Sequence, residues 1–317
     1  MTHPCIHNCT IDDMELNMKK VQVLLSAYNG EKYLEEQIRS ILAQEHKQLT
    51  LLIRDDGSTD RTIDIIKRYA DNYENVAYYT GKNLGVQQSF FNLMKHADKT
   101  ADFYAFADQD DVWMPDKITR AIALLEKEST DLPLLYASET KLVDEHLAEL
   151  PVKIRKYAVV PDFGNAVVEN ICTGCTEVFN RSLLEMVIPV VPRYAIMHDW
   201  WLYLCASCFG KVIYDPDPYM LYRQHANNKI GKNGTWRGEL RTRLTNFGRS
   251  YGALRRQARE FRRVYGTTYA RSQYIDWVAD YKKKFDYRWK LVTSSEIHRQ
   301  RWLDDVIFRG LFLLGMR

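Results

Sequence analysis

Three carboxylates stand together at Asp108, Asp110 and Asp111, interrupted only by Gln109. They follow the largely apolar run 102–107, which predicts a buried strand. Carboxylates at the end of a strand are costly to bury unless a cation or hydrogen-bond donors meet them. Hard oxygen ligands suit Mg²⁺ or Mn²⁺, and ligands of open α/β sheets bind at this edge. The cluster therefore predicts either a divalent-metal site that carries a phosphorylated ligand or a solvated acidic turn.

Alternating strand and helix patterns surround this cluster. Short apolar runs predict strands at 21–27, 49–53, 76–79 and 102–107, and helical spacing predicts helices within 31–45, 63–69 and 86–97. Ser58 or Thr59 is expected to cap the second helix, and Pro115 to begin the helix after the cluster. The alternation predicts an α/β fold with a doubly wound, mostly parallel sheet flanked by helices. Neither a Gly-x-Gly-x-x-Gly turn after the first strand nor a P-loop motif is present, which argues against those two nucleotide-binding classes.

The pattern continues with shorter elements after residue 132. We expect strands at 134–137, 176–179, 211–214 and 219–223. A helix is expected over 199–208, with its N-terminus at His198-Asp199. These segments extend the predicted sheet beyond the acidic cluster.

Four landmarks then stand in order along the chain: Ser26-Ala27-Tyr28-Asn29-Gly30, Asp55-Asp56-Gly57-Ser58-Thr59-Asp60, Asp108-Gln109-Asp110-Asp111 and His198-Asp199-Trp200-Trp201. Together they resemble the family 2 glycosyltransferases, which have the GT-A fold, over roughly residues 21–230. Asn83-Leu84-Gly85 and Thr173-Gly174 stand where such enzymes carry similar residues. The run 107–113 and the later Tyr222-Arg223-Gln224-His225 look most like bacterial rhamnosyltransferases of surface polysaccharide synthesis.

The resemblance implies an inverting, metal-dependent transfer of a sugar, L-rhamnose from dTDP-rhamnose, onto a glycan or lipid-linked glycan acceptor. In this transfer the acceptor hydroxyl displaces the nucleoside diphosphate, and a cation, here Mg²⁺ or Mn²⁺, is needed to stabilise the departing diphosphate. Asp110 is our first candidate for a metal ligand, and His225 is a further one. Asp108 is expected to contact the ribose or the sugar, or to reach the metal through water, whereas Asp111 supports the loop or caps the next helix.

Asp199 matches the position of the family's catalytic base. A helix N-terminus favours the ionised carboxylate, which must lie within hydrogen-bond reach of the acceptor hydroxyl. His198 is the competing base, and Asp199 as a plain helix cap is the other alternative.

Further residues are assigned to the two substrates. Tyr28 can stack on the nucleobase, and Asp55 or Asp56 can accept hydrogen bonds from base or ribose; alternation leaves open which of the two faces the ligand. The expected acceptor contacts include Trp200 and Trp201, of which at least one is a core candidate. The donor set is Ala27, Tyr28, Asn29, Asp55, Asp56, Asn83, Gly85, Asp108 and Gln109, and the acceptor set is Gly174, His198, Trp200 and Trp201.

The charge of the chain is unevenly distributed. The 317 residues carry a net charge of +3, yet residues 231–317 hold 20 Lys and Arg against 8 Asp and Glu. We therefore expect a disordered extension at 1–17, a catalytic domain at 18–230 and a basic helical region at 231–317, with helices at 239–247, 253–265 and 274–290. Residues 306–316 are apolar but too few to cross a bilayer.

Basic helices with interleaved aromatics bind anionic membranes or nucleic acid. We expect the basic region to hold the enzyme on the cytoplasmic face of the cell membrane, with no nucleic-acid partner. Packing on the catalytic body, or a homodimer, is the alternative. The absence of a signal-peptide pattern favours a cytoplasmic protein.

The cysteines invite a metal assignment that we do not adopt. Cys172, Cys175, Cys205 and Cys208 form two Cys-x-x-Cys pairs, a pattern that can hold zinc. Their apolar neighbours favour buried, reduced thiols instead. Three other functions remain open: a UDP-hexose-dependent transferase of the same fold, a sugar-nucleotide nucleotidyltransferase, and a non-catalytic nucleic-acid-binding protein.

Overall fold

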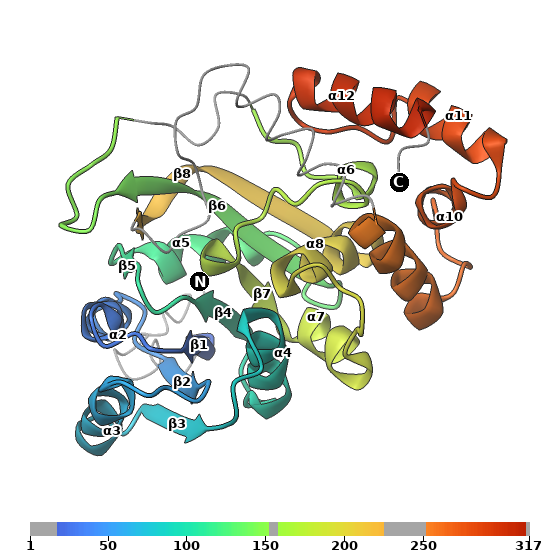
Figure 1. The fold of residues 1–317 in the computed structure, drawn as a ribbon. Coiled ribbons are helices and arrows are strands. Elements are labelled where there is room, and N and C mark those ends of the chain that lie inside the picture. Colours follow the sequence, from blue (N-terminus) through green and yellow to red (C-terminus); the bar gives the residue numbers. More distant parts are fainter. Residues whose placement is uncertain (1–17, 152–157, 225–251, 315–317) are drawn as a thin grey trace, which may run out of the picture.

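The structure, a computed structural model, describes residues 18–151, 158–224 and 252–314 (Figure 1). The expectations for residues 1–17, for a helix at 239–247 and for His225 as a metal ligand lie outside these residues.

One eight-stranded sheet, in the order β3-β2-β1-β4-β7-β6-β8-β5, forms the centre of the molecule (Figure 1). Neighbours β1–β2, β1–β4, β2–β3 and β6–β8 pair in parallel, whereas β4–β7, β6–β7 and β5–β8 are antiparallel. The predicted α/β fold with a mostly parallel sheet is therefore confirmed. The strands are β1 (Val21–Ala27), β2 (Leu49–Asp55), β3 (Val76–Thr80), β4 (Phe103–Ala107), β5 (Val112–Trp113), β6 (Leu134–Val143), β7 (Val178–Asn180) and β8 (Lys211–Arg223).

Helices cover both faces of the sheet. On one face lie α2 (Leu34–Leu42), α3 (Thr62–Asn72) and α5 (Lys117–Leu125); on the other lie α4 (Val86–His96), α6 (Phe163–Ala166), α7 (Arg181–Val187) and α8 (His198–Phe209). Each face has its own buried core. In β1, Val23 and Leu25 belong to the core beneath α2, α3 and α5, whereas Leu24 belongs to the core beneath α4 and α8, so the strand is apolar at consecutive positions. Two short 3₁₀ turns, η1 (Gly174–Thr176) and η2 (Ile188–Val190), complete this part.

The C-terminal helices share a core with α8. A helix at 252–265 is followed by α10 (Gln273–Asp280), α11 (Phe285–Thr293) and α12 (Trp302–Leu313). The rings of Phe261 and Trp201 lie 5.5 Å apart, and apolar side chains of all four helices belong to the same buried cluster as α8. Within the described ranges, no helix has the length and apolarity that a bilayer crossing requires.

Polar contacts fix the segment between α11 and α12 onto the chain around α6. Arg299 forms an ion pair with Glu169 at 3.1 Å, and the Gln300 backbone N–H donates to the same carboxylate. The amide of Asn165 donates to the His298 carbonyl. The C-terminal helices are thus attached to the segment that leads from α6 toward η1.

Several predicted boundaries need correction. Helix α3 begins at Thr62 and not at a Ser58 or Thr59 cap, because Ser58 accepts the Asn29 N–H and Thr59 donates its backbone N–H to the Asn29 side chain. Helix α5 begins at Lys117, two residues beyond Pro115. The strand predicted at 176–179 is shorter, because η1 occupies its start, and the two strands predicted at 211–223 form one strand, β8. The helix predicted at 274–290 is interrupted between Asp280 and Phe285.

Candidate active site

A cavity of about 440 Å³ opens beside the carboxyl ends of β1, β2 and β4. This is the edge at which ligands of open α/β sheets bind. Its wall contains most of the donor residues proposed from sequence together with Asp110. The lining residues are Ser26, Tyr28, Asp56, Asn83, Gly85, Val86, Phe90, Asp108, Gln109, Asp110 and Tyr222.

Asp56 and Asp55 differ in what they can do for a ligand. Asp56 lines the cavity, and its carboxylate accepts the backbone N–H groups of Leu84 and Gly85. Asp55 is not among the lining residues; its carboxylate accepts the Ser58 N–H and stabilises the turn after β2. Of the two, Asp56 is therefore the one that lies at the cavity, and Asp55 lies outside its lining.

Buried Arg54 organises this wall of the cavity. Its guanidinium pairs with Asp56 and also donates to the Ser89 hydroxyl at 2.9 Å and to the Lys82 carbonyl at 2.9 Å. Only 2% of Arg54 is exposed. Arg54 and Asp56 together hold the loop 81–85, which carries Asn83 and Gly85, against the end of the sheet.

The opposite wall is held by hydrogen bonds between the β1 and β4 loops. The Tyr28 backbone N–H donates to the Gln109 side chain at 2.7 Å, and the Gln109 amide donates to the Tyr28 carbonyl at 3.1 Å. The Tyr28 ring remains largely exposed at the cavity, where a base could stack on it. Ala27 is fully buried and contributes its carbonyl to the Asp56 N–H, while Asn29 ties the two loops together, so both position the cavity without lining it.

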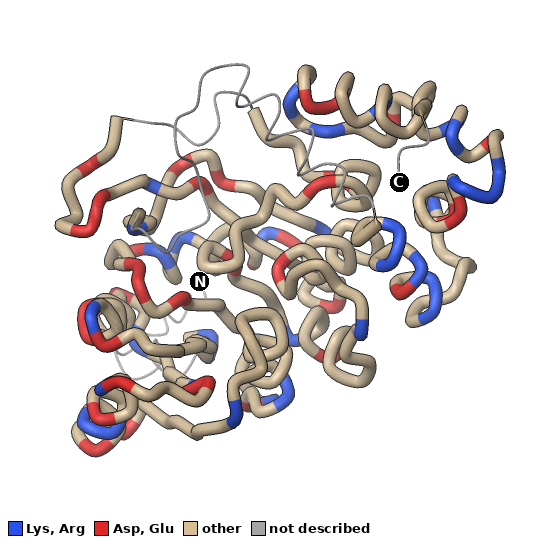
Figure 2. The backbone as a smooth tube through the Cα atoms, in the orientation of Figure 1, with Lys and Arg blue, Asp and Glu red and all other residues tan. Residues whose placement is uncertain are grey.

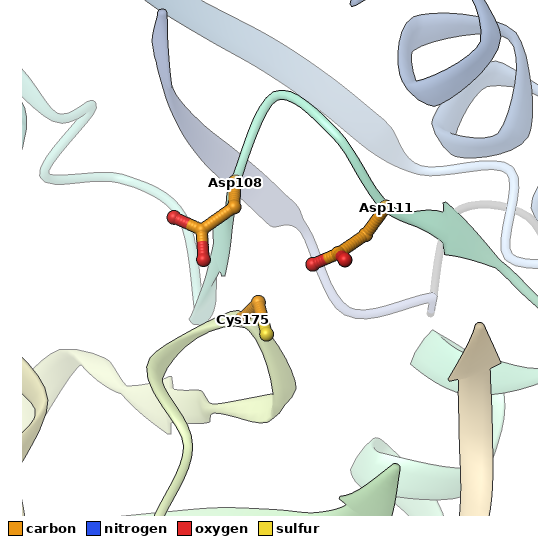
Figure 3. Close-up of side chains that lie close together, drawn as sticks. All are labelled: Asp108, Asp111 and Cys175. Carbon is orange, nitrogen blue, oxygen red and sulfur yellow. The ribbon is translucent and has the colours of Figure 1, made fainter. Parts of the chain in front are cut away.

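The acidic loop brings Asp108 and Asp111 together with Cys175 (Figure 3). One potential ligand atom from each lies within 4.8 Å of the others. Burial raises the pKa of Asp108 to about 7, with the nearby charges of Asp110 and Asp199 adding to the shift. Burial likewise raises the pKa of the Asp111 carboxyl and of the Cys175 thiol well above their usual values.

These carboxylates fit a hard divalent cation. Asp111 accepts the Arg223 backbone N–H through Oδ1, whereas its buried Oδ2 meets no other hydrogen-bond donor among the described residues than the nearby Cys175 thiol. A cation between Asp108 and Asp111 would neutralise the repulsion and satisfy this oxygen. Asp111 thus supports the loop, as expected from sequence, and is also a candidate ligand that sequence reasoning missed. The neutral Cys175 thiol suits Mg²⁺ or Mn²⁺ poorly.

Two buried cationic side chains support the acidic loop from behind. Arg223 donates to the Asp110 carbonyl at 2.9 Å and to the Glu145 carbonyl at 2.7 Å. Lys117 Nζ donates to the Cys175 carbonyl at 2.7 Å, and burial lowers the pKa of this lysine to about 7. Arg223 thus positions the acidic loop and Lys117 positions η1 beside it, and neither side chain lines the cavity.

Asp199 lies at the start of α8, close enough to Asp108 for its charge to raise the Asp108 pKa. Its carboxylate accepts the Gly174 N–H at 3.2 Å and the Trp200 N–H at 2.6 Å. Burial raises the Asp199 pKa to about 6, while these hydrogen bonds and one from Asn170 oppose the shift. A carboxylate of this pKa is ionised at neutral pH and a stronger base than an exposed aspartate.

The remaining acceptor candidates are less accessible than expected. The His198 ring stacks on Phe90 at 4.0 Å, and burial lowers its pKa to about 3, so His198 is a neutral packing residue behind Asp199. Trp201 is fully buried in the core and is withdrawn as an acceptor contact. Trp200 is half-buried, with its indole N–H donating to the Ala166 carbonyl. A Cβ on Gly174 would lie 3.1 Å from His198 Nε2, so glycine allows this close approach.

Sequence reasoning missed the residues that act from beneath the site. Arg54 and Lys117 stand in ordinary apolar or helical patterns, which gave no signal, and Cys175 was noted only as part of a Cys-x-x-Cys pair. Tyr222, which lines the cavity, stood within the run that carried the resemblance to rhamnosyltransferases. Within the described residues no disulfide joins Cys172, Cys175, Cys205 or Cys208, and the two Cys-x-x-Cys pairs form no four-cysteine metal cluster.

Residues 22–187 match the family model described as Glycosyl transferase family 2. The chain belongs to glycosyl transferase family 2. It is 31% identical over 234 residues to a protein of Shigella flexneri named dTDP-rhamnosyl transferase RfbG, covering 68% of this chain and 77% of that protein. It is 30% identical over 220 residues to an uncharacterized glycosyltransferase of Nostoc, covering 67% of each.

Solved glycosyltransferase structures share the fold of this family 2 chain. Staphylococcus aureus TarS 1–349 in complex with UDP-GlcNAc has a TM-score of 0.59 at 16% identity, covering 94% of this chain and 82% of that chain. The mannosyltransferase PcManGT of Pyrobaculum calidifontis, in complex with GDP-Man and Mn²⁺, has a TM-score of 0.55 at 16% identity, covering 95% and 76%. At such identities the likeness concerns the fold.

Proposed function

We propose that this family 2 enzyme is an inverting, metal-dependent glycosyltransferase that moves L-rhamnose from dTDP-rhamnose onto a glycan or lipid-linked glycan of the cell surface. Two features together carry the proposal. Asp108 and Asp110 lie in the wall of the cavity, and a separate buried carboxylate, Asp199, lies near Asp108. The cavity carboxylates would hold the cation that stabilises the departing diphosphate, and Asp199 would accept the proton of the acceptor hydroxyl. A nucleotidyltransferase or a nucleic-acid-binding protein has no use for Asp199.

The donor is inferred from similarity and from the cavity. The relative named dTDP-rhamnosyl transferase favours dTDP-rhamnose, and the structural neighbours with UDP-GlcNAc or GDP-Man support a nucleotide sugar in general. Tyr28 offers a ring for the base, and Asp56 and Asn83 offer polar atoms in the wall of the cavity. A UDP-hexose is the second candidate donor, favoured by the likeness to TarS with UDP-GlcNAc.

Asp108 and Asp111, which lie together, would hold the divalent cation, with Asp110 in the cavity wall as a further candidate ligand; a structural neighbour contains Mn²⁺. A bound Mg²⁺ or Mn²⁺ would supply Lewis-acid stabilisation of the diphosphate. Residues of the chain position the acidic loop: Gln109 fixes it beside Tyr28, and Arg223 fixes the backbone of Asp110.

Asp199 would take the proton of the acceptor hydroxyl as that oxygen attacks the anomeric carbon. In a single displacement the nucleoside diphosphate leaves from the opposite face, so the anomeric configuration inverts. The hydrogen bonds from Gly174 and Trp200 orient the carboxylate without neutralising it. The general-base role needs only that the acceptor hydroxyl reach this carboxylate.

A panel of nucleotide sugars tests the proposal. The full chain is incubated with dTDP-rhamnose, UDP-glucose, UDP-GlcNAc and GDP-mannose, with Mn²⁺ or with a chelator, and thermal stabilisation and donor hydrolysis are measured. We expect metal-dependent stabilisation by dTDP-rhamnose above the other donors. A preference for a UDP-hexose would replace the donor, and no response to any nucleotide sugar would overturn the function.

A further inference from the structure

Exposed apolar side chains gather on the last two helices. Of the sixteen large apolar side chains that are exposed among the described residues, seven lie between residues 285 and 314. Five of them are on or beside α12: Trp302, Leu303, Val306, Leu313 and Leu314. The other two, Phe285 and Trp289, lie one turn apart on α11. These seven residues are called the C-terminal face below.

The five residues of α12 form one continuous stripe. At about 100° per residue, Trp302, Val306, Leu313, Leu303 and Leu314 fall within an arc of about 120°, together with Gly310. Phe308, Leu311 and Phe312 fall on the opposite side and are buried in the core. The charged residues of α12 lie outside the arc, and Asp305 is paired with Arg309 at 2.7 Å. Helix α12 is therefore apolar on two sides, and among the described residues the chain covers only one of them.

Basic residues border this face. Lys283, Lys284, Lys290 and Arg301 are exposed next to it, and the described residues 252–314 hold 14 Lys and Arg against 7 Asp and Glu. Figure 2 shows Lys and Arg along these helices and the turns between them. An exposed apolar stripe with a cationic border fits a bilayer with anionic headgroups, where tryptophan prefers the interface. A second copy of the chain would bring like charges together.

We propose that the C-terminal face is a membrane-docking surface that inserts Trp289, Trp302 and the α12 stripe into an anionic lipid interface. This deepens the proposed function, on which it rests only in its choice of a lipid-linked acceptor. The ion pair between Arg299 and Glu169 attaches the residues just before α12 to the segment 158–170. Asn170 at the end of this segment and Gly174 beyond it donate hydrogen bonds to Asp199. The docking surface and the candidate base are thus connected through the same segment.

Co-sedimentation of the full chain with vesicles tests the surface. Vesicles of phosphatidylglycerol and phosphatidylethanolamine are compared with pure phosphatidylcholine. We expect binding to the anionic vesicles that weakens with salt, and at least a tenfold loss of partitioning in Trp302→Ser/Val306→Asn/Leu313→Gln. Lys283→Gln/Lys284→Gln/Lys290→Gln should lose the salt-sensitive part of the binding.

A matched control removes exposed apolar side chains elsewhere: Tyr73→Ser, Leu132→Gln and Val190→Asn. This control should bind like the parent chain, and circular dichroism checks that every variant is folded. Absence of binding by the parent chain, or unchanged binding by the apolar triple variant, overturns the proposal. So does a change from dimer to monomer in that variant, measured by light scattering. Metal-dependent donor hydrolysis, measured without vesicles, reports on the proposed function separately.

Discussion

Asp199 and His198 are neighbours in sequence, yet the structure gives them different environments. Asp199 keeps two backbone hydrogen bonds and lies near Asp108, whereas His198 is enclosed between apolar rings. The sequence favoured Asp199 as the base over its competitor His198, and the burial of His198 among apolar rings supports that choice. Burial depends on the packing of α4 against α8, which local sequence does not reveal.

Asp199→Asn should lower kcat by about 10²- to 10⁴-fold, because general-base catalysis contributes on that order. The KM for the donor should stay nearly unchanged, since the donor cavity does not contain Asp199. Steady-state kinetics with the preferred donor and acceptor measures both constants. His198→Phe is the matched variant and should retain most activity. Full activity of Asp199→Asn would remove this residue from the mechanism.

The same carboxylate predicts the acidic limb of the pH profile. Burial raises the Asp199 pKa to about 6, so the base form is present above that pH and is lost below it. The ratio kcat/KM should therefore fall about tenfold per pH unit below this value and level off above it. Rates measured at saturating Mn²⁺ between pH 5 and 8 check this. A limb near pH 4 would indicate a solvated carboxylate instead.

At the scale of elements, the bounds of the first four strands could be predicted to within two residues. Apolar runs such as 21–27 are covered on both faces, so their pattern is strong. The 3₁₀ turn η1 was not predicted, and β8 was predicted as two strands, 211–214 and 219–223, because its continuity depends on pairing with the distant strand β6. Which of Asp55 and Asp56 lies at the cavity likewise depends on the loop 81–85, which is distant in sequence.

Loop 81–85 depends on Arg54, which predicts a measurable effect of removing that side chain. Arg54→Met leaves Asp56 buried without its cation, so we expect a loss of about 3–5 kcal/mol of unfolding free energy. The donor KM should rise more than kcat falls, because the loop lines the donor cavity. Denaturant unfolding and kinetics measure the two effects. Arg68→Met, which breaks an exposed ion pair with Glu35, should cost less than about 1 kcal/mol.

The acidic loop between β4 and β5 predicts stabilisation by a divalent cation. Mn²⁺ at 100 times its Kd should add about 2.7 kcal/mol to the unfolding free energy, since the folded chain alone assembles Asp108 with Asp111. Thermal unfolding with and without Mn²⁺ measures the shift. Asp108→Asn and Asp111→Asn should each reduce it, and Asp116→Asn, outside the cluster, should not. Equal shifts in all variants would place the cation elsewhere.

For the molecule as a whole, the uneven charge distribution suggested a domain boundary near residue 230. The buried core, however, continues across that boundary. Side chains of residues 254–312 belong to the same buried cluster as α8, including Phe261 beside Trp201. Aromatic residues of the basic region were therefore underestimated as core. The spacing of these residues predicted helices, but it did not predict that the helices pack against α8.

Truncation after Ile230 should consequently destabilise the remaining chain and not release a folded catalytic domain. Removing these helices exposes the apolar surface around Trp201 and the carboxylate of Glu169 that Arg299 pairs. We expect aggregation or ANS binding by the truncated chain, measured beside the full chain. A soluble, cooperatively folding 1–230 fragment with metal-dependent donor hydrolysis would contradict this expectation.

The attachment of the C-terminal helices to segment 158–170 has a kinetic consequence. A chain docked through α12, as proposed above, would carry the candidate base Asp199 at a fixed height above the bilayer, and a lipid-linked acceptor would meet it by lateral diffusion. The quantity that sets the rate is the mole fraction of acceptor in the membrane, not its concentration in the bulk solution. Diluting the acceptor with neutral detergent or inert lipid, at constant total acceptor, should slow turnover as its surface density falls.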